Sequence, residues 1–294
     1  MDGVLLVDKP VSVGSAEAVR KIKALVRPAR VGHLGTLDPF ATGLLPILVG
    51  EATKLAPFLQ DAEKEYTGVI RLGLETDTLD PTGAVTRSAE VPAIDSARLA
   101  EIAARFTGKI IQQPPIFSAI KRDGVPMYKL ARRGVEVEQP APREVEISRL
   151  QIDQIDSTAL RFVAVCSTGT YMRSLARDVG VALGSVAHLA ELRRTRSGSF
   201  NVERARPLDE VLAILSAGRE SELLVGLSEA LAAMPQAEAG PLEVRMLRNG
   251  DSRALDGIAP AGAKQFKVVS SGRLIAVAEA TSRVTARVVR VFGN

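Results

Sequence analysis

The chain has 294 residues, 46% hydrophobic and 24% charged, which is the balance of a globular protein with a sizeable core and not of a disordered or fibrous chain. A single cysteine excludes an intramolecular disulfide, and only two histidines argue against a zinc site built from Cys and His. Neither a signal peptide nor an apolar run long enough to span a bilayer is visible, so we expect a cytoplasmic protein.

Local patterns in the first part of the chain predict helices and strands in irregular order. Strands are expected at residues 3–7, 66–74, 109–113, 144–151 and 160–166. Ser15, Asp95 and Thr170 are candidate N-caps of helices that run to residues 25, 106 and 183. Two more helices are expected at 208–215 and 221–234. Because no regular βαβ alternation is present, the fold class is α+β with a mixed, mainly antiparallel sheet.

The texture of the sequence changes after residue 236. Short alternating segments punctuated by Gly predict strands at 243–247, 266–269, 274–279 and 287–292. We therefore expect a large domain at 1–236 and a small β module at 237–294. The net charge is only +4, but residues 241–294 carry nine basic and four acidic residues, and further arginines cluster at 192–206. Such clusters are the footprint of a phosphate-backbone partner, although a solvated charged face explains most of them.

A lone carboxylate, Asp38, stands in the otherwise uncharged residues 31–50. A carboxylate among Leu37, Phe40 and similar side chains loses hydration on folding and needs a cation, backbone donors or a raised pKa. Pro39 directs Asp38 away from helical conformation, which indicates a structured loop. Two interpretations stay open on these residues alone: Asp38 is the N-cap of a short helix with Pro at its first position, or it is a catalytic group.

The surrounding string and several further motifs resemble the TruB family of tRNA pseudouridine synthases. The matching segments are 8–10 (DKP), 32–33 (GH), 35–39 (GTLDP), 41–46 (ATGLLP), 50–54 (GEATK), 64–66 (KEY), 72–73 (LG), 75–78 (ETDT), 113–115 (QPP), 118–121 (SAIK), 166–171 (CSTGTY), 173–178 (RSLARD) and 192–195 (LRRT). They follow the family order. The chain departs from the family pattern at Ser12, Gly14 and Leu34, which bears on details of RNA contact and not on activity.

The resemblance implies the pseudouridine synthase fold with a central cleft, a C-terminal module similar to a PUA domain, and isomerisation of the T-loop uridine at tRNA position 55. It implies Asp38, Tyr66 and Arg173 as catalytic residues and His33, Leu192, Lys9 and Pro10 as substrate-binding residues. No cofactor is expected, because the reaction is a net isomerisation and the sequence has neither a dinucleotide nor a Walker loop nor metal-ligand spacing.

Several of these residues also have ordinary structural interpretations. A Tyr in a strand is by default a packing residue, but the resemblance makes Tyr66 the platform on which the extruded base stacks and the group near its C5 proton. Arg173 stands in the first turn of a helix, where the macrodipole disfavours a cation, and by resemblance its compensating anion is Asp38. His33 matches a family residue that inserts into the RNA loop, so we assign it to recognition and not to proton transfer.

The basic, Pro-containing residues 122–144, with Arg122, Lys129, Arg132, Arg133 and Arg143, are expected to form a surface segment that by resemblance closes over the RNA arm. The expected partner is the T-arm of tRNA, with no membrane and no guide RNA, and we expect a monomer. Two other functions stay open: an RNA-binding or RNA-folding module in which chemistry is secondary, and a guide-RNA-dependent synthase of the same superfamily.

Overall fold

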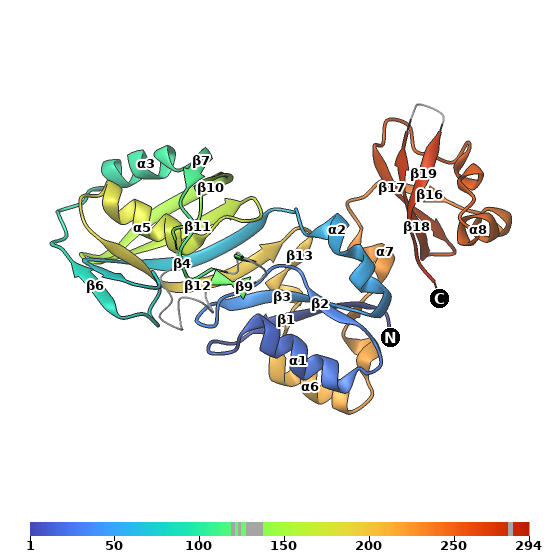
Figure 1. The fold of residues 1–294 in the computed structure, drawn as a ribbon, viewed down its shortest axis with the longest axis horizontal. Helices are drawn as coiled ribbons and strands as arrows, with labels where there is room; N and C mark the ends of the chain where they lie inside the picture. The colour runs from blue at the N-terminus through green and yellow to red at the C-terminus, as the bar shows by residue number, and fades with distance from the viewer. Residues whose placement is uncertain (119–120, 123–124, 128–137, 282–284, 294) are drawn as a thin grey trace.

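The computed structural model of the chain describes residues 1–118, 121–122, 125–127, 138–281 and 285–293. It shows a long sheet with helices packed on it and a smaller β module at the C-terminal end (Figure 1). The expectations for residues 119–120 and for Lys129, Arg132 and Arg133 of the basic segment lie outside the described residues. Next to them, β8 (Lys121–Arg122) and β9 (Val125–Pro126) pair as a short hairpin.

The large sheet is mixed and mainly antiparallel, as the sequence predicts. Its main path is β14 (Arg206–Pro207), β1 (Gly3–Lys9), β3 (Thr42–Val49), β12 (Ala187–Ser197), β4 (Lys64–Leu72), β11 (Ala159–Cys166), β10 (Arg143–Asp156) and β7 (Gly108–Gln112). Three short strands join from the sides: β2 (Val31–His33) on β3, β13 (Phe200–Asn201) on β12 and β15 (Leu224–Val225) on β1. Within the described part of this sheet, only β1 with β14 and β12 with β3 run parallel.

Helices cover the sheet in two groups (Figure 1). α1 (Ser15–Leu25) and α6 (Leu208–Ser216) pack on each other near β1, whereas α3 (Ser96–Arg105) packs on β10 and α5 (Met172–Ala182) on β12. Ile22, Leu175 and Val211 bring apolar faces of these helices into one core with the sheet. The central strands β12 and β4 thus lie between the two groups, and the candidate residues cluster around them.

Only one of the three expected helix caps is confirmed. Asp95 caps α3 by accepting a hydrogen bond from the Arg98 amide at 2.8 Å. The prediction for Ser15 is wrong, because Ser15 is the first residue of α1 and its hydroxyl exchanges hydrogen bonds with the Leu37 backbone at 2.8 and 2.9 Å. The prediction for Thr170 is also wrong, because its hydroxyl donates to the preceding turn and α5 begins two residues later. In both cases a tertiary or turn contact outcompetes the cap.

Two expected elements beyond residue 216 are wrong in type. The single helix expected at 221–234 is replaced by a 3₁₀ turn at Glu220–Glu222, by β15, and by the short α7 (Leu227–Ala230). Leu224 and Val225 pair with the free edge of β1, which gains ladder hydrogen bonds that a helix would forgo. The strand expected at 243–247 is the helix α8 (Pro241–Arg248), whose start combines Gly240 with Pro at the first helical position.

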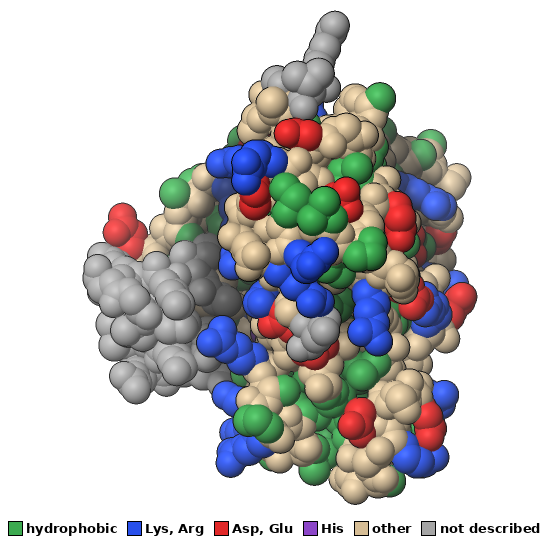
Figure 2. Space-filling model, turned by 90° about the vertical axis from the view of Figure 1, so that its right-hand side faces the viewer, with side chains coloured by type: hydrophobic (Ala, Val, Ile, Leu, Met, Phe, Trp, Pro, Cys, Tyr) green, Lys and Arg blue, Asp and Glu red, His purple; other side chains and the backbone are tan. Residues whose placement is uncertain are grey.

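The C-terminal sheet otherwise follows the prediction. It has the order β16 (Gln236–Glu238), β17 (Gln265–Ser270), β18 (Arg273–Ala280) and β19 (Ala286–Val291). Leu274, Val277 and Phe292 of this module share an apolar cluster with Leu48 and other residues of the large sheet. The two parts are therefore joined through a common core. Figure 2 faces this module and shows lysine and arginine side chains near the middle of its surface. Among the described residues, no helix is both long and apolar enough to span a bilayer.

Candidate active site

Asp38 lies in the loop between β2 and β3, at the start of a turn and not of a helix. The Ala41 amide donates to the Asp38 carbonyl at 3.1 Å, and β3 begins directly afterwards at Thr42. The helix-cap interpretation is therefore wrong. Leu37, the preceding residue, is held on both backbone groups by the buried Ser15 hydroxyl, so the loop has a fixed path. A carboxylate on such a loop is pre-organised, because its backbone cannot relax around it.

Arg173 meets Asp38 from the first turn of α5, across 135 residues of sequence. Its Nε lies 2.9 Å from Asp38 Oδ2, and its Nη2 donates to Oδ1 at 3.4 Å. The Arg173 side chain is 5% exposed and that of Asp38 33%. The guanidinium thus contacts both carboxylate oxygens while one side of Asp38 stays open. The carboxylate also compensates a cation that the N-terminus of α5 disfavours.

The remaining donors of Arg173 bind the backbone of two other loops. Nη1 donates to the Thr78 carbonyl at 2.9 Å, and Nη2 donates to the Phe117 carbonyl at 2.8 Å. The loop that supplies Thr78 joins β5 (Leu74–Thr76) to β6 (Val85–Ser88). The Arg173 guanidinium therefore holds the Asp38 loop, the β5–β6 loop and the segment that contains Phe117 around one point.

Asp80 is a second carboxylate beside Arg173, and sequence reasoning did not single it out. It is buried, and its Oδ2 lies 3.7 Å from Arg173 Nη1. Its Oδ1 accepts hydrogen bonds from the Thr78 hydroxyl and from the Thr82 amide and hydroxyl, at 2.6 to 2.9 Å. Asp80 lies two residues after the motif at 75–78, and this proximity is the feature of the sequence that could have identified it.

The environment of Asp38 makes its carboxylate both oriented and more basic than one in water. Burial raises the pKa of the Asp38 carboxyl, and the nearby Asp80 charge raises it further. The Arg173 cation acts in the opposite direction without cancelling the effect of burial. A carboxyl with a raised pKa in a partly open position has the properties of a catalytic group, since it can take up and release a proton closer to neutral pH.

Tyr66 lies on β4, next to the site and almost fully covered. It is 8% exposed, and it pairs in register with Ala164 of β11 and Arg194 of β12. Burial raises the pKa of its phenol. Leu192, which is two residues before Arg194 on the same face of β12, is 7% exposed and belongs to the same apolar cluster as Tyr66. Tyr66 and Leu192 thus share one apolar cluster with Leu37 and Phe40 of the Asp38 loop.

Lys9 and Pro10 lie where β1 ends, and His33 where β2 ends. Lys9 is fully buried, and its Nζ donates to the carbonyls of Pro10 at 2.8 Å and Val13 at 2.7 Å. Burial lowers its pKa to about 8, although Asp38 acts in the opposite direction. Pro10 is exposed. His33 is half-buried, its Nδ1 has no hydrogen-bond partner among the described residues, and burial lowers its pKa. All three border the Asp38 loop.

Arg194 is a further central residue that sequence reasoning counted only as part of a basic cluster. It is 0% exposed and is the largest of the fully buried side chains in the described chain. Its Nε donates to the Leu44 carbonyl at 2.7 Å, and its Nη2 donates to the Gly35 carbonyl at 3.2 Å. Arg193, the preceding residue on the strand, is partly exposed instead and forms an ion pair with Asp8 at 2.6 Å.

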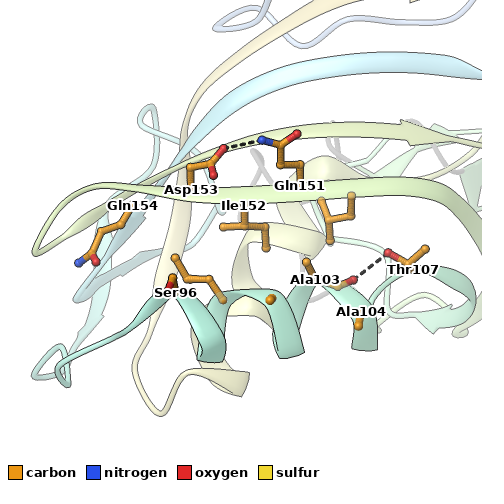
Figure 3. Close-up of a pocket in the computed structure, with 11 residues that line it drawn as sticks. Ser96, Ala103, Ala104, Thr107, Gln151, Ile152, Asp153 and Gln154 are labelled. Atoms are coloured by element: carbon orange, nitrogen blue, oxygen red, sulfur yellow. Dashed lines mark hydrogen bonds between the residues drawn. The ribbon is translucent and has the colours of Figure 1, made fainter.

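A pocket of about 710 Å³ lies elsewhere, between α3 and β10 (Figure 3). It is lined by Ser96, Ala103 and Thr107 on the helix side and by residues such as Ile152 and Gln154 on the strand side. None of the candidate residues lines it, so it is separate from the Asp38 site. Within the described part of the chain, no group of three His, Cys, Asp or Glu side chains converges as metal ligands would.

Comparison with known proteins gives a consistent family. The model of the TruB family pseudouridylate synthase N-terminal domain matches residues 23–172, and that of the tRNA pseudouridylate synthase B C-terminal domain matches residues 173–234. The tRNA pseudouridine synthase B of Geobacter sulfurreducens is 41% identical over 306 residues, which cover 99% of this chain and 100% of the relative. That of Aromatoleum aromaticum is 42% identical, with coverages of 95% and 89%.

Solved structures agree with this. A Cbf5-Nop10-Gar1 complex contains a chain that superposes with a TM-score of 0.76 at 27% identity, covering 99% of this chain and 85% of that one. The pseudouridine synthase fold expected from the motifs is thereby confirmed. With a family model over half of its length and relatives aligned from end to end, the chain belongs to the TruB family of pseudouridylate synthases and is an enzyme of the isomerase class.

Proposed function

We propose that this enzyme converts the uridine at position 55 in the T-loop of tRNA to pseudouridine, with Asp38 as the essential carboxylate. The observation that carries the proposal is the ion pair between Asp38 and Arg173 at 2.9 Å, which leaves the Asp38 side chain 33% exposed and close enough to Tyr66 for its charge to act on the phenol. The relatives named tRNA pseudouridine synthase B support tRNA as the substrate.

The reaction breaks the N1–C1′ bond of the nucleoside and forms a C5–C1′ bond after the base has turned. C5 then loses a proton, whose bonding pair restores the ring double bond, and N1 gains one, so atoms and electrons balance without a cofactor. Asp38 acts on the ribose either as a nucleophile at C1′ or as an acid/base group. Arg173 serves both routes, because it orients the carboxylate and opposes its protonation.

The base must leave the RNA stack before Asp38 can reach its ribose. Tyr66 then offers a face for stacking and a hydroxyl for the C5 proton, and Leu192 covers the base from β12. His33 occupies the place that the base vacates in the RNA loop. Lys9 and Pro10 support the wall of the site from the end of β1, where the Lys9 ammonium binds two backbone carbonyls.

We also propose that residues 1–236 form the catalytic domain and that the module at 237–294 adds contacts to the tRNA backbone. Arg245, Arg273 and Arg290 are exposed on this module, and none of them has a carboxylate partner among the described residues. Exposed, unpaired arginines are suited to phosphate contacts, which contribute affinity and not chemistry. Figure 2 shows the side of the molecule that carries this module, where Lys and Arg side chains are interspersed with Asp and Glu.

A guide-dependent mode is the second candidate, because a structure of an H/ACA RNP bound to a substrate RNA superposes with a TM-score of 0.76 at 25% identity. The identity of 41% to a tRNA pseudouridine synthase B over the full chain favours direct action on tRNA. The assay that separates the two incubates the purified protein with unmodified tRNA, without guide RNA, and maps pseudouridine by nucleotide.

Asp38→Asn tests the catalytic assignment in the same assay. Asn is nearly isosteric but lacks the negative charge, so the variant should fold, bind tRNA about as well as the parent, and make no detectable pseudouridine. Asp153→Asn is the control, because Asp153 is exposed on β10, accepts a hydrogen bond from Gln151, and is not among the candidate residues. Turnover that persists in a folded Asp38→Asn protein would falsify the assignment.

A further inference from the structure

Arg194 has an unusual environment for a buried cation. Two of its nitrogens bind the carbonyls of Leu44 and Gly35, but its third, Nη1, is buried without a hydrogen-bond partner. No carboxylate of the described residues lies within ion-pair distance of it. Leaving a buried guanidinium without an anion costs stability, since its hydration is lost and not replaced by an opposite charge. Because a buried arginine without an anion lowers stability, we look for a role of Arg194 other than packing.

The position of Arg194 on the sheet suggests that role. In the β12–β4 ladder it stands directly opposite Tyr66, so both side chains project from the same face at the spacing of a cross-strand pair. Through Gly35 it also binds the loop that carries Asp38. A Cβ added at Gly35 would lie 3.4 Å from Nη1, which places this loop directly over the guanidinium. Arg194 therefore touches the supports of both catalytic groups.

We propose that Arg194 is a positioning residue for the reaction: it fixes the Asp38 loop to the central strand and places an uncompensated positive charge beside the Tyr66 phenol. The inference rests on the proton role of Tyr66 proposed above. An arginine with a purely structural role would need only its hydrogen bonds to the carbonyls of Leu44 and Gly35. The positive charge of Arg194 also acts on the Tyr66 phenol, which such a role does not require.

The charged groups around Tyr66 support this role of Arg194. Burial is the largest effect and raises the pKa of the phenol, and Cys166 on β11 and Asp38 in the loop raise it further. Arg194 on β12 lowers it, through its charge and through a side-chain hydrogen bond. The pKa of the Cys166 thiol is itself raised to about 11, so this group is neutral at working pH. Arg194 supplies the largest charge effect on Tyr66. Its charge also lowers the pKa of Lys9, His33 and Lys64.

The chemical consequence concerns the C5 proton. Once the Tyr66 phenol has given its proton to N1, the phenolate left behind accepts the C5 proton as the C5–H bonding pair restores the ring double bond. The neutral phenol is thereby regenerated and the protons balance. In the buried position of Tyr66, the phenolate would be strongly disfavoured without a nearby cation. An unpaired guanidinium stabilises this anion more than a salt-bridged one, because no carboxylate offsets its charge.

The test measures the ionisation of Tyr66 separately from activity. The chain has three tyrosines and no tryptophan, so phenolate absorbance can be measured in the full protein without overlap from indole absorbance. Uniform incorporation of 3,5-difluorotyrosine moves phenol ionisation toward neutral pH, and subtraction of the matching Tyr66→Phe protein isolates the Tyr66 signal. We compare the parent with Arg194→Met and Arg194→Lys, and use Arg193→Met as the matched control on the same strand.

Arg194→Met should raise the Tyr66 pKa by about 1 to 3, the size of effect expected from removal of one close charge, while Arg193→Met leaves it unchanged. Arg194→Lys keeps the charge but not the fork, so its phenol should titrate closer to the parent. In both Arg194 variants kcat should fall by about a hundredfold with little change in KM for tRNA.

Equal Tyr66 titration in the Arg194→Met and Arg193→Met proteins would overturn the proposal. If Arg194→Met does not fold, the same comparison is made with Arg194→Gln, which retains a side-chain donor. The outcome is distinct from failure of the proposed function: normal turnover in Tyr66→Phe would remove the proton role of Tyr66, whereas the titration reports on Arg194 in either case.

Discussion

At the residue scale, the candidate site combines one partly exposed carboxylate with enclosed side chains that hold it. Asp38 keeps an open side, while Arg173 is almost fully enclosed and directs its other donors to backbone carbonyls. Asp80 is enclosed as well and bonds the hydroxyls of its own loop. Because Arg173 and Asp80 are held by fixed partners, the open carboxylate needs little reorganisation when substrate arrives.

Tyr66→Phe tests the proton role at this scale. The variant keeps the stacking face and the apolar contacts, so tRNA binding should stay near the parent value while turnover falls about a hundredfold or more. Tyr66→Leu should lose both properties. Single-turnover rates and equilibrium binding of the same tRNA separate them. Parent-like turnover in the Phe variant would leave Tyr66 as a platform only.

At the element scale, the parallel contact of β3 with β12 determines where the Asp38 loop ends. Gly43, at the start of β3, has a φ of 98° and pairs with Arg194 of β12. A Cβ at this position would lie 2.8 Å from the Arg194 amide nitrogen and closer still to its carbonyl oxygen. The absence of a side chain at Gly43 therefore lets the loop close onto the strand that carries Leu192 and Arg194.

Gly43→Ala should destabilise the protein by more than about 1 kcal/mol, because the backbone conformation and the close approach both exclude a methyl group. Gly32→Ala is the matched control, since a Cβ there has open space within 4 Å and no positive φ. Thermal unfolding of both variants gives the comparison. A Gly43→Ala protein as stable as Gly32→Ala would contradict this account of the β3–β12 contact.

At the scale of the whole molecule, the C-terminal module is more than an appendage. Leu274, Val277 and Phe292 are buried against the large sheet, and the Gly293 amide donates to Glu51 at 2.9 Å. Truncation after residue 236 would expose the other side of this cluster, so a shortened protein should be less stable as well as weaker in binding. Substitutions on the exposed face test RNA binding without that complication.

The pair of substitutions Arg273→Gln and Arg290→Gln in the full chain should weaken tRNA binding with kcat unchanged. The salt dependence of binding should become shallower by about one in slope for each phosphate that the variant no longer binds. Arg253→Gln is the control, because Arg253 is already paired with Asp251 at 2.6 Å. Binding measured over a series of salt concentrations gives the slopes. Identical slopes in the parent and the double variant would argue against a tRNA-binding role of this face.

Much of the architecture follows from local sequence. Alternation of apolar residues predicted the strands around 160–166, 266–269 and 274–279 to within a residue or so, and Asp95 caps its helix as expected. These features depend on neighbouring residues alone. The predictions for 221–234 and 243–247 are wrong. Part of the first segment pairs with β1 as a strand, and the second forms a helix that begins with Gly240 and Pro241.

The sequence by itself determined the family, through motifs whose residues stand in a recognisable order, and it nominated Asp38, Tyr66 and Arg173. The pairing of Arg173 with Asp38, which the resemblance implied, is confirmed by the structure. Only the tertiary structure decided that Asp80 lies beside Arg173 and that Arg194 is buried without an ion pair among the described residues, whereas its neighbour Arg193 is bound to Asp8. The physical reason is that Arg193 and Arg194 have the same side chain, so the sequence does not tell them apart. Their side chains point to opposite faces of the strand, and the groups that each one contacts come from segments far away in the sequence.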